Sequence, residues 1–178
     1  MKNIYVVRHC QALGQDADAP LSNKGMEQAY ELGDFLLEYD INHIISSPYK
    51  RAIQSIKPFS NHLNIPIVED IRLRERVLSS TNLTDWMNKL KSTFNDMNLS
   101  YEGGESSHCA LKRIVDVVEE HRDFKNILLV THGNIMSLLL HYYDSTYGFN
   151  EWKSLTNPDV YCISIGQKMS IKRLWVDE

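Results

Sequence analysis

The chain has 178 residues, of which 43% are hydrophobic and 24% charged, and this predicts one domain over residues 1–178 with a single core. Its net charge of −4 argues against a nucleic-acid partner, since general phosphate affinity needs clustered Lys and Arg in excess. Cys10, Cys109 and Cys162 form no CxxC pair, and the longest apolar tract, 127–140, is too short to span a bilayer. We therefore expect a soluble cytoplasmic protein without a membrane partner.

Short apolar runs alternate with segments of helical periodicity in the first half of the chain. Ser22 is a predicted N-cap, because apolar residues recur at helical spacing after it. Ser47-Pro48 predicts the start of a second helix with the proline at its first position, and Pro58 is expected to kink or shorten that helix. The predicted strands are 3–7, 43–46 and 65–68, and the predicted helices are 22–39, 49–63 and 83–95.

The second half continues this alternation. The turn at Gly103-Gly104 precedes a helix that runs to about residue 121. The later predicted elements are a strand at 126–131, a helix at 134–143, and a hairpin of strands 160–165 and 169–176. Strands that alternate with helices predict an α/β fold, here a single-domain three-layer sandwich with a mostly parallel sheet and helices on both faces.

Two of the predicted strands end in residues that carry chemistry. Arg8-His9 follows the apolar run 4–7, and His132-Gly133 follows the run 126–131. Ligands of open α/β sheets bind at the carboxyl ends of the strands. We therefore expect two imidazoles and a guanidinium to meet at one edge of the sheet.

Transfer of a phosphoryl group needs positive donors, an in-line nucleophile and an acid for the leaving oxygen. Arg8, Arg51 and His132 are candidate donors to the phosphate oxygens. His9 is the candidate nucleophile, and Glu75 is the candidate proton donor to the alcohol. These five residues form the predicted catalytic set.

Six motifs occur in order along nearly the whole chain: Arg8-His9; Leu21-Ser22-Asn23-Lys24-Gly25 with Gln28-Ala29; Ser46-Ser47-Pro48 with Arg51-Ala52; Leu73-Arg74-Glu75-Arg76; Gly104-Glu105-Ser106 with Arg113; and Val130-Thr131-His132-Gly133. In these motifs the chain resembles the histidine phosphatase superfamily, which includes the cofactor-dependent phosphoglycerate mutases. The resemblance implies a phosphoglycerate mutase-like fold. It also assigns the roles given above to the matching five residues.

The first motif departs from the family pattern. That pattern continues with glycine, then Glu or Gln, then Thr, and has an asparagine further on. In this chain Cys10, Gln11 and Ala12 follow the histidine, and Gln15 stands near the place of the asparagine. The residues expected to contact the substrate are Gln11, Gln15, Gly133 and Asn134.

Cys10 is the largest of these departures. A thiol beside Arg8 and His9 is expected to lie in a positive field, which favours its thiolate and its reaction with peroxide. The alternative is a thiol that is turned away from the site and buried, where it only fills space.

Other polar residues have a structural interpretation. His43, His62, His108, His121 and His141 end no predicted strand, so we expect them to be structural. Glu105 and Ser106 are expected to cap a helix, although Glu105 is the next candidate for the acid if Glu75 belongs to an ordinary charged loop.

Three functions fit these residues. The favoured function is hydrolysis of small phosphorylated metabolites through a phosphohistidine on His9, without a metal or another cofactor. The alternatives are phosphoglycerate mutase-type transfer, for which the segment between Glu75 and Gly104 is short, and a non-catalytic module that binds a phosphorylated ligand. A zinc site is disfavoured because HExxH and paired cysteines are absent from the sequence and the arginines beside His9 repel a cation.

Substrate specificity is expected to lie in residues 77–102. Five large apolar or aromatic side chains of this segment form either a lid over the site or a helix face packed on the core: Trp86, Met87, Phe94, Met97 and Tyr101.

Overall fold

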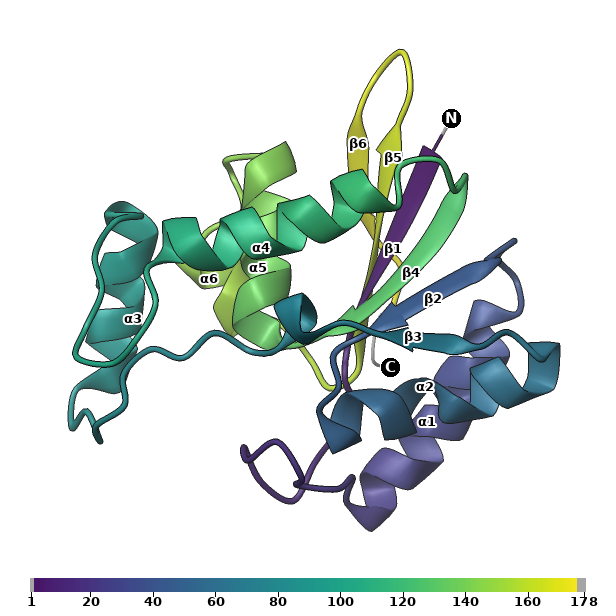
Figure 1. The fold of residues 1–178 in the computed structure, drawn as a ribbon, viewed down its shortest axis with the longest axis horizontal. Helices are drawn as coiled ribbons and strands as arrows, with labels where there is room; N and C mark the ends of the chain where they lie inside the picture. Colours follow the sequence, from purple (N-terminus) through teal and green to yellow (C-terminus); the bar gives the residue numbers. More distant parts are fainter. Residues whose placement is uncertain (1, 176–178) are drawn as a thin grey trace.

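The computed structural model describes residues 2–175 and contains a six-stranded sheet in the order β3-β2-β4-β1-β5-β6 (Figure 1). Strands β3, β2, β4 and β1 run parallel to one another, β5 is antiparallel to β1, and β6 returns beside β5 as a hairpin. The strands are β1 (Lys2–Arg8), β2 (His43–Ser46), β3 (Ile67–Glu69), β4 (Asn126–Thr131), β5 (Asp159–Ile165) and β6 (Ser170–Arg173).

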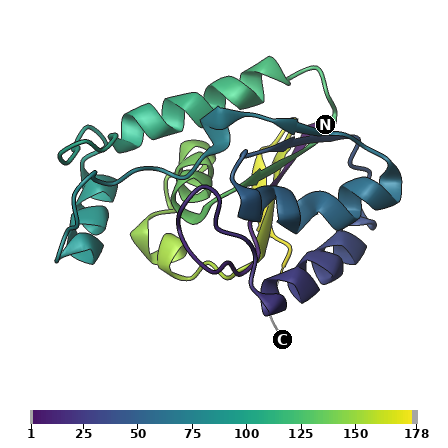
Figure 2. The ribbon, with the colours of Figure 1, turned by 60° about the horizontal axis from the view of Figure 1, so that its bottom comes forward.

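Helices cover both faces of this sheet. Figure 2 shows α1 and α2 together on one side of the strands and α4 on the other. The helices are α1 (Asn23–Leu36), α2 (Lys50–Leu63), α3 (Trp86–Asn95), α4 (Ser107–Glu120), α5 (Gly133–Tyr143) and α6 (Phe149–Lys153). The predicted α/β sandwich with a mostly parallel sheet is therefore confirmed.

The central strands are buried on both faces, as their continuous apolar runs predict. In β1, Ile4 and Val6 pack into the core beneath α4 and α5, whereas Tyr5 and Val7 pack into the core beneath α1 and α2. Because successive side chains of a strand point to opposite faces, one short run serves two cores.

The predicted start of α2 is wrong. The N-cap is Tyr49 and the helix begins at Lys50, so Pro48 precedes the helix instead of occupying its first position. Pro58 does not shorten α2, which continues to Leu63. At this point α2 packs closely on α1, because Gly33 has no side chain and a Cβ there would lie 3.4 Å from the Cβ of Pro58.

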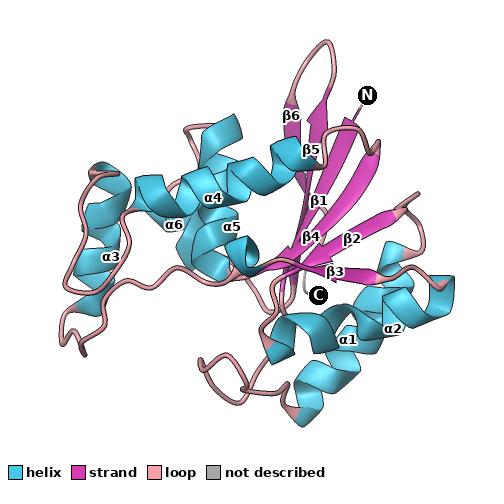
Figure 3. Cartoon of the chain, viewed as in Figure 1, coloured by secondary structure: helices cyan, strands magenta, loops and turns pink. Residues whose placement is uncertain are grey.

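The connection between the two cores is less regular. A 3₁₀ helix (Ile71–Leu73) lies in the predicted charged loop, and a long loop leads from it to α3 (Figure 3). Helix α3 begins at Trp86, later than predicted, and the short helix α6 was not predicted. Val176, the end of the predicted hairpin, lies outside the described residues. None of the helices among residues 2–175 is long and apolar enough to cross a membrane.

Candidate active site

Three neighbouring strands bring the predicted chemistry to one edge of the sheet. Strand β4 pairs in parallel with both β1 and β2, so the residues after these strands lie side by side. His9 follows β1, Ser47 follows β2 and His132 follows β4. The backbone N–H of His9 donates to the carbonyl oxygen of Thr131 at 3.1 Å, and the ring centroids of His9 and His132 are 5.1 Å apart.

The hydrogen bonds of His9 define its protonation. Nδ1 lies 2.7 Å from the carbonyl oxygen of Cys10, and because a carbonyl only accepts, Nδ1 carries the proton. Nε2 then accepts from Nε of Arg51 at 3.2 Å. Burial lowers the pKa of His9 to about 3, and the charges of Arg51 and Arg8 act in the same direction. A neutral imidazole with its lone pair on Nε2 is the nucleophilic form.

Arg51 is held beside His9 by further contacts. It lies in the first turn of α2 and is buried. Its Nη1 donates to the carbonyl oxygen of Asp16 at 2.7 Å, and its Cζ lies 5.0 Å from the ring centre of Tyr49. Burial lowers the pKa of Arg51, and the charge of Glu75 opposes this shift. The guanidinium is therefore oriented before any ligand arrives.

His132 presents a second ring nitrogen to the site. Its Nε2 lies 2.8 Å from Oγ of Ser47, and its buried Nδ1 has no hydrogen-bond partner within residues 2–175. Burial lowers the pKa of His132 well below its ordinary value, and His9 and the nearby arginines add to this effect. When the Ser47 hydroxyl donates to Nε2, the proton lies on Nδ1, which is then a donor available to a ligand.

Arg8 is fixed at the end of β1. Its Nη1 donates to the carbonyl oxygens of Leu155 and Thr156, at 3.0 and 3.3 Å, while its buried Nε has no partner in the described chain. The guanidinium lies against Gly133, where a Cβ would be 3.2 Å from Nε. Glycine at this position therefore gives Arg8 its space, and neither Nε nor Nη2 of Arg8 makes a hydrogen bond to the described residues.

Glu75 approaches the same edge from the loop after the 3₁₀ helix. Its Oε2 accepts from the backbone N–H of Asn134, and its Oε1 from that of Ile135, both at 3.1 Å. These N–H groups belong to the first turn of α5, where a helix favours negative charge. Glu75 also acts electrostatically on Arg8 and Arg51, so the carboxyl group lies at the border of the basic site.

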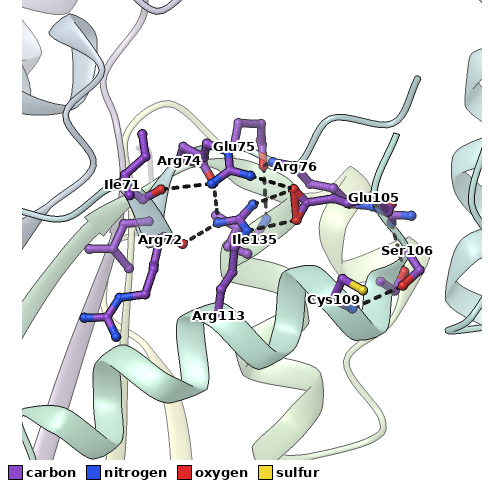
Figure 4. A network of polar contacts seen from close by, with 12 residues as sticks. Ile71, Arg72, Arg74, Glu75, Arg76, Glu105, Ser106, Cys109, Arg113 and Ile135 are labelled. Carbon is purple, nitrogen blue, oxygen red and sulfur yellow. Dashed lines mark hydrogen bonds and ion pairs between the residues drawn. The ribbon is translucent and has the colours of Figure 1, made fainter. Parts of the chain in front are cut away.

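A polar network holds the segment that carries Glu75 (Figure 4). Arg113 of α4 donates to the carbonyl oxygens of Arg72 and Arg74. Glu105 pairs with Arg113 at 2.8 Å and with Arg74 at 3.5 Å. Glu105 is thus an ion-pair partner and not a helix cap, whereas Ser106 caps α4 as predicted, accepting from the N–H of Cys109.

Comparison with known proteins identifies the family of this chain. A sequence profile of the histidine phosphatase superfamily (branch 1) matches residues 4–177. The chain belongs to this superfamily. It is therefore an enzyme of the phosphatase and phosphoglycerate mutase-like kind.

The relatives include both kinds of protein. The probable phosphoglycerate mutase GpmB of Escherichia coli O1:K1 is 26% identical, and the alignment covers 100% of this chain and 92% of that protein. A mycobacterial glucosyl-3-phosphoglycerate phosphatase in complex with inorganic phosphate has a TM-score of 0.78 at 22% identity, covering 98% of this chain and 96% of its own. A phosphoglycerate mutase from Bacillus anthracis has a TM-score of 0.74 at 19% identity, covering 97% and 92%. The chain shares its fold with both solved structures.

The four residues that were predicted to contact the substrate lie in different surroundings. Gln15 lines the same cavity as Arg51 and Glu75. The side chain of Asn134 is buried without a hydrogen-bond partner among the described residues, and Gly133 lies against Arg8. Gln11 instead accepts from the hydroxyl of Ser22 at 2.8 Å, which ties its side chain to the start of α1.

The expected thiolate at Cys10 is wrong. The side chain is fully buried in the core beneath α1 and α2, and burial raises its pKa to about 12. Its backbone N–H donates to Oγ of Ser55 at 2.8 Å. The thiol is therefore turned into the core, and its position beside the nucleophile in the sequence does not place it beside the phosphate site.

Three supporting residues were missed in the sequence. Ser47 was predicted as a helix cap and as part of a family motif, without a contact to the site, yet it bonds His132. Tyr49 packs on both Arg51 and His132, with its ring centre 5.0 Å from that of His132. Asn157 donates to the carbonyl oxygen of His9 at 2.7 Å from a loop with no recognisable signal. For Ser47 the signal was its position, since it ends a strand as the two histidines do.

Proposed function

We propose that this enzyme hydrolyses small phosphomonoesters through a phosphohistidine on His9. The observation that carries the proposal is a set of buried donors around the nucleophile. Arg8 Nε and His132 Nδ1 have no hydrogen-bond partner among residues 2–175, although buried polar groups are nearly always paired. A phosphoryl group on His9 gives both donors an acceptor, and Arg51 adds a third donor on the nucleophile itself.

The reaction proceeds in two steps, formation of the phosphohistidine and its hydrolysis. In the first, the lone pair of His9 Nε2 forms a bond to phosphorus, the bond from phosphorus to the alcohol oxygen breaks, and Glu75 gives its proton to that oxygen. In the second, Glu75 takes a proton from water, the water oxygen bonds to phosphorus, and the bond to Nε2 breaks. Arg8, Arg51 and His132 stabilise the negative charge on the phosphate oxygens in both steps.

Hydrolysis is favoured over transfer to a second substrate by the surroundings of Glu75. Glu75 lines a cavity of about 550 Å³ together with exposed residues such as Gln15 and Val77, which leaves a route for water. The mutase-type alternative is supported by the names of the curated relatives. The two functions differ in whether inorganic phosphate is released without an acceptor.

Metal independence is part of the proposal, because the guanidinium groups of Arg8 and Arg51 repel a cation. Purified enzyme is assayed for phosphate release from a panel of alkyl phosphomonoesters, with and without a chelator. We expect release that is unchanged by the chelator and needs no added acceptor. Release that requires a metal, or transfer with no release, overturns this function.

A further inference from the structure

A cavity of about 550 Å³ extends from the basic site along the loop that precedes α3. Its apolar wall is formed by five side chains from three parts of the chain: Tyr49, Val77, Leu78, Leu83 and Trp86. Trp86 is 48% exposed and Val77 41% exposed, so both side chains are accessible to a ligand in the cavity. An apolar wall with a few polar groups is typical of a small-molecule site.

The wall begins at the phosphate site and ends at the surface. Tyr49 contacts both Arg51 and His132, so the cavity starts where the phosphoryl group is expected. Trp86 lies at the first position of α3, and its ring packs edge-on against Trp152 of α6, with centroids 6.3 Å apart. The exposed indole is therefore held by a second aromatic ring and is not a freely rotating surface side chain.

Charged groups in this cavity are few. Among the described residues that line it, the charged ones are Arg51, Glu75 and Arg76. Arg51 is bonded to His9 and to the Asp16 carbonyl. Glu75 accepts from the backbone N–H groups of Asn134 and Ile135. This leaves Arg76 as the group to examine.

Arg76 is directed into the protein. Its Nε donates to the carbonyl oxygen of Glu105 at 3.0 Å, and its Nη1 donates to the hydroxyls of Thr93 and Ser107 at 2.9 and 2.8 Å. Its Nη2 is buried and has no hydrogen-bond partner among the described residues. The side chain therefore ties α3 and α4 to the Glu75 segment and keeps one donor unpaired.

We infer that this cavity binds the alcohol half of the substrate, and that this half carries a flat apolar ring that packs on Trp86. The inference rests on the proposed function, since it concerns the leaving group of the same reaction. It makes Trp86 a specificity-determining residue.

The test compares three alkyl phosphomonoesters: 2-phenylethyl phosphate, ethyl phosphate and 3-phosphoglycerate. All three are alkyl esters, so the leaving oxygens are similar and the comparison reports on the cavity. We expect kcat/KM to be highest for 2-phenylethyl phosphate, because neither ethyl phosphate nor 3-phosphoglycerate has a ring to pack on Trp86. Trp86→Ala lowers kcat/KM for 2-phenylethyl phosphate by about tenfold, mainly through KM, and leaves ethyl phosphate unchanged.

Two variants control the experiment. Trp86→Phe keeps a ring and restores most of the preference. Met87→Ala removes a similarly exposed apolar side chain from the same helix and leaves all three substrates unaffected, which separates ring contact from a general effect on α3. Equal kcat/KM for the phenylethyl and ethyl esters, a preference for 3-phosphoglycerate, or equal losses for all substrates in Trp86→Ala overturns the inference while hydrolysis itself persists. The absence of hydrolysis of every ester instead overturns the proposed function.

Discussion

The sheet carries two histidine pairs, one at each end of its strands, and they differ in what surrounds them. His9 and His132 follow the carboxyl ends of β1 and β4, with ring centroids 5.1 Å apart. His43 begins β2 and lies against His121 at the end of α4, with centroids 4.8 Å apart. Similar ring distances therefore occur in two very different settings.

The neighbours decide what each pair can do. His43 and His121 bond each other, with 3.0 Å from Nε2 to Nδ1, and His43 stacks on Phe124 at 3.9 Å. His9 and His132 instead bond to other groups, and His132 Nδ1 is left without a partner in the described chain. A pair that satisfies itself is structural, whereas a pair with an unused donor and with a lone pair that faces Arg51 is prepared for an anion.

The largest expected effect separates the two pairs directly. His9→Ala removes the nucleophile, and we expect the rate of phosphate release to fall by about 10⁴-fold or more. His43→Ala removes a histidine of the other pair and leaves kcat unchanged. Steady-state phosphate release from an alkyl ester measures both. Comparable losses in the two variants contradict the distinction.

Glu75→Gln tests the proton donor. We expect a loss of about 10² to 10⁴-fold for an alkyl ester, because its alkoxide leaves only when protonated, and a much smaller loss for formation of the phosphoenzyme from an activated aryl ester. The ratio of pre-steady-state rates for the two esters is the measurement. Equal losses for both esters assign the acid to another group.

Arg51→Lys keeps the positive charge beside His9 but removes the planar donor group. Since Nε of Arg51 is the group that meets His9 Nε2, a flexible ammonium does not reproduce the contact. We expect kcat to fall by about 10² to 10³-fold. Full activity of the lysine variant shows that a positive charge beside His9 is sufficient for catalysis, and that the donor geometry around His9 and His132 is unimportant.

Ser47→Ala removes the hydrogen bond to His132 and a weaker one from the backbone N–H of Tyr49. The loss of the bond to His132, about 1 kcal/mol, predicts a decrease in kcat of about fivefold, with protein stability measured by urea unfolding as the control. Ser46→Ala is the matched variant, since Ser46 is equally buried but its hydroxyl donates to the carbonyl oxygen of Ser47. A larger loss of activity in Ser46→Ala than in Ser47→Ala contradicts the role of Ser47.

The smallest expected effect is that of His43, which pairs with His121, on the pH dependence of protein stability. Burial and the charge of His121 lower the pKa of His43 from its ordinary value of 6.5. As the pH falls, His43 therefore binds a proton in the unfolded chain at a higher pH than in the folded chain. The folded state loses stability as the pH falls below that value. His43→Phe keeps a ring against Phe124 and removes this contribution. We expect its urea midpoint to fall less than that of the wild type between about pH 8 and about pH 5, and an unchanged pH dependence contradicts this.

The sequence was sufficient to predict those features that depend on a local pattern of residues. The strands at 43–46 and 126–131 have the predicted bounds, and Ser22 and Ser106 cap α1 and α4 as expected. Residues at strand ends were predicted to meet because parallel strands align their carboxyl ends, and the register of β1, β2 and β4 brings them together. The catalytic roles of these residues stay predictions.

Features that depend on side-chain direction were beyond the sequence. Cys10 follows His9 directly, yet its thiol enters the core while the imidazole faces the site. Glu105 looked like a cap, but Arg113 and Arg74 draw its carboxylate into ion pairs across the fold. Trp86 fitted a packed helix face as well as a lid, and the structure places its half-exposed ring beside the cavity and against Trp152 of α6.

The central claim is that His9, paired with His132, accepts the phosphoryl group. The most direct test mixes Glu75→Gln with a labelled activated aryl phosphate, quenches in base, and maps the label to a peptide. The account predicts label on His9 that survives base and is lost in acid, in the presence of a chelator, and no label in the variant that also carries His9→Ala. Turnover without such an adduct, or label on another residue, contradicts it.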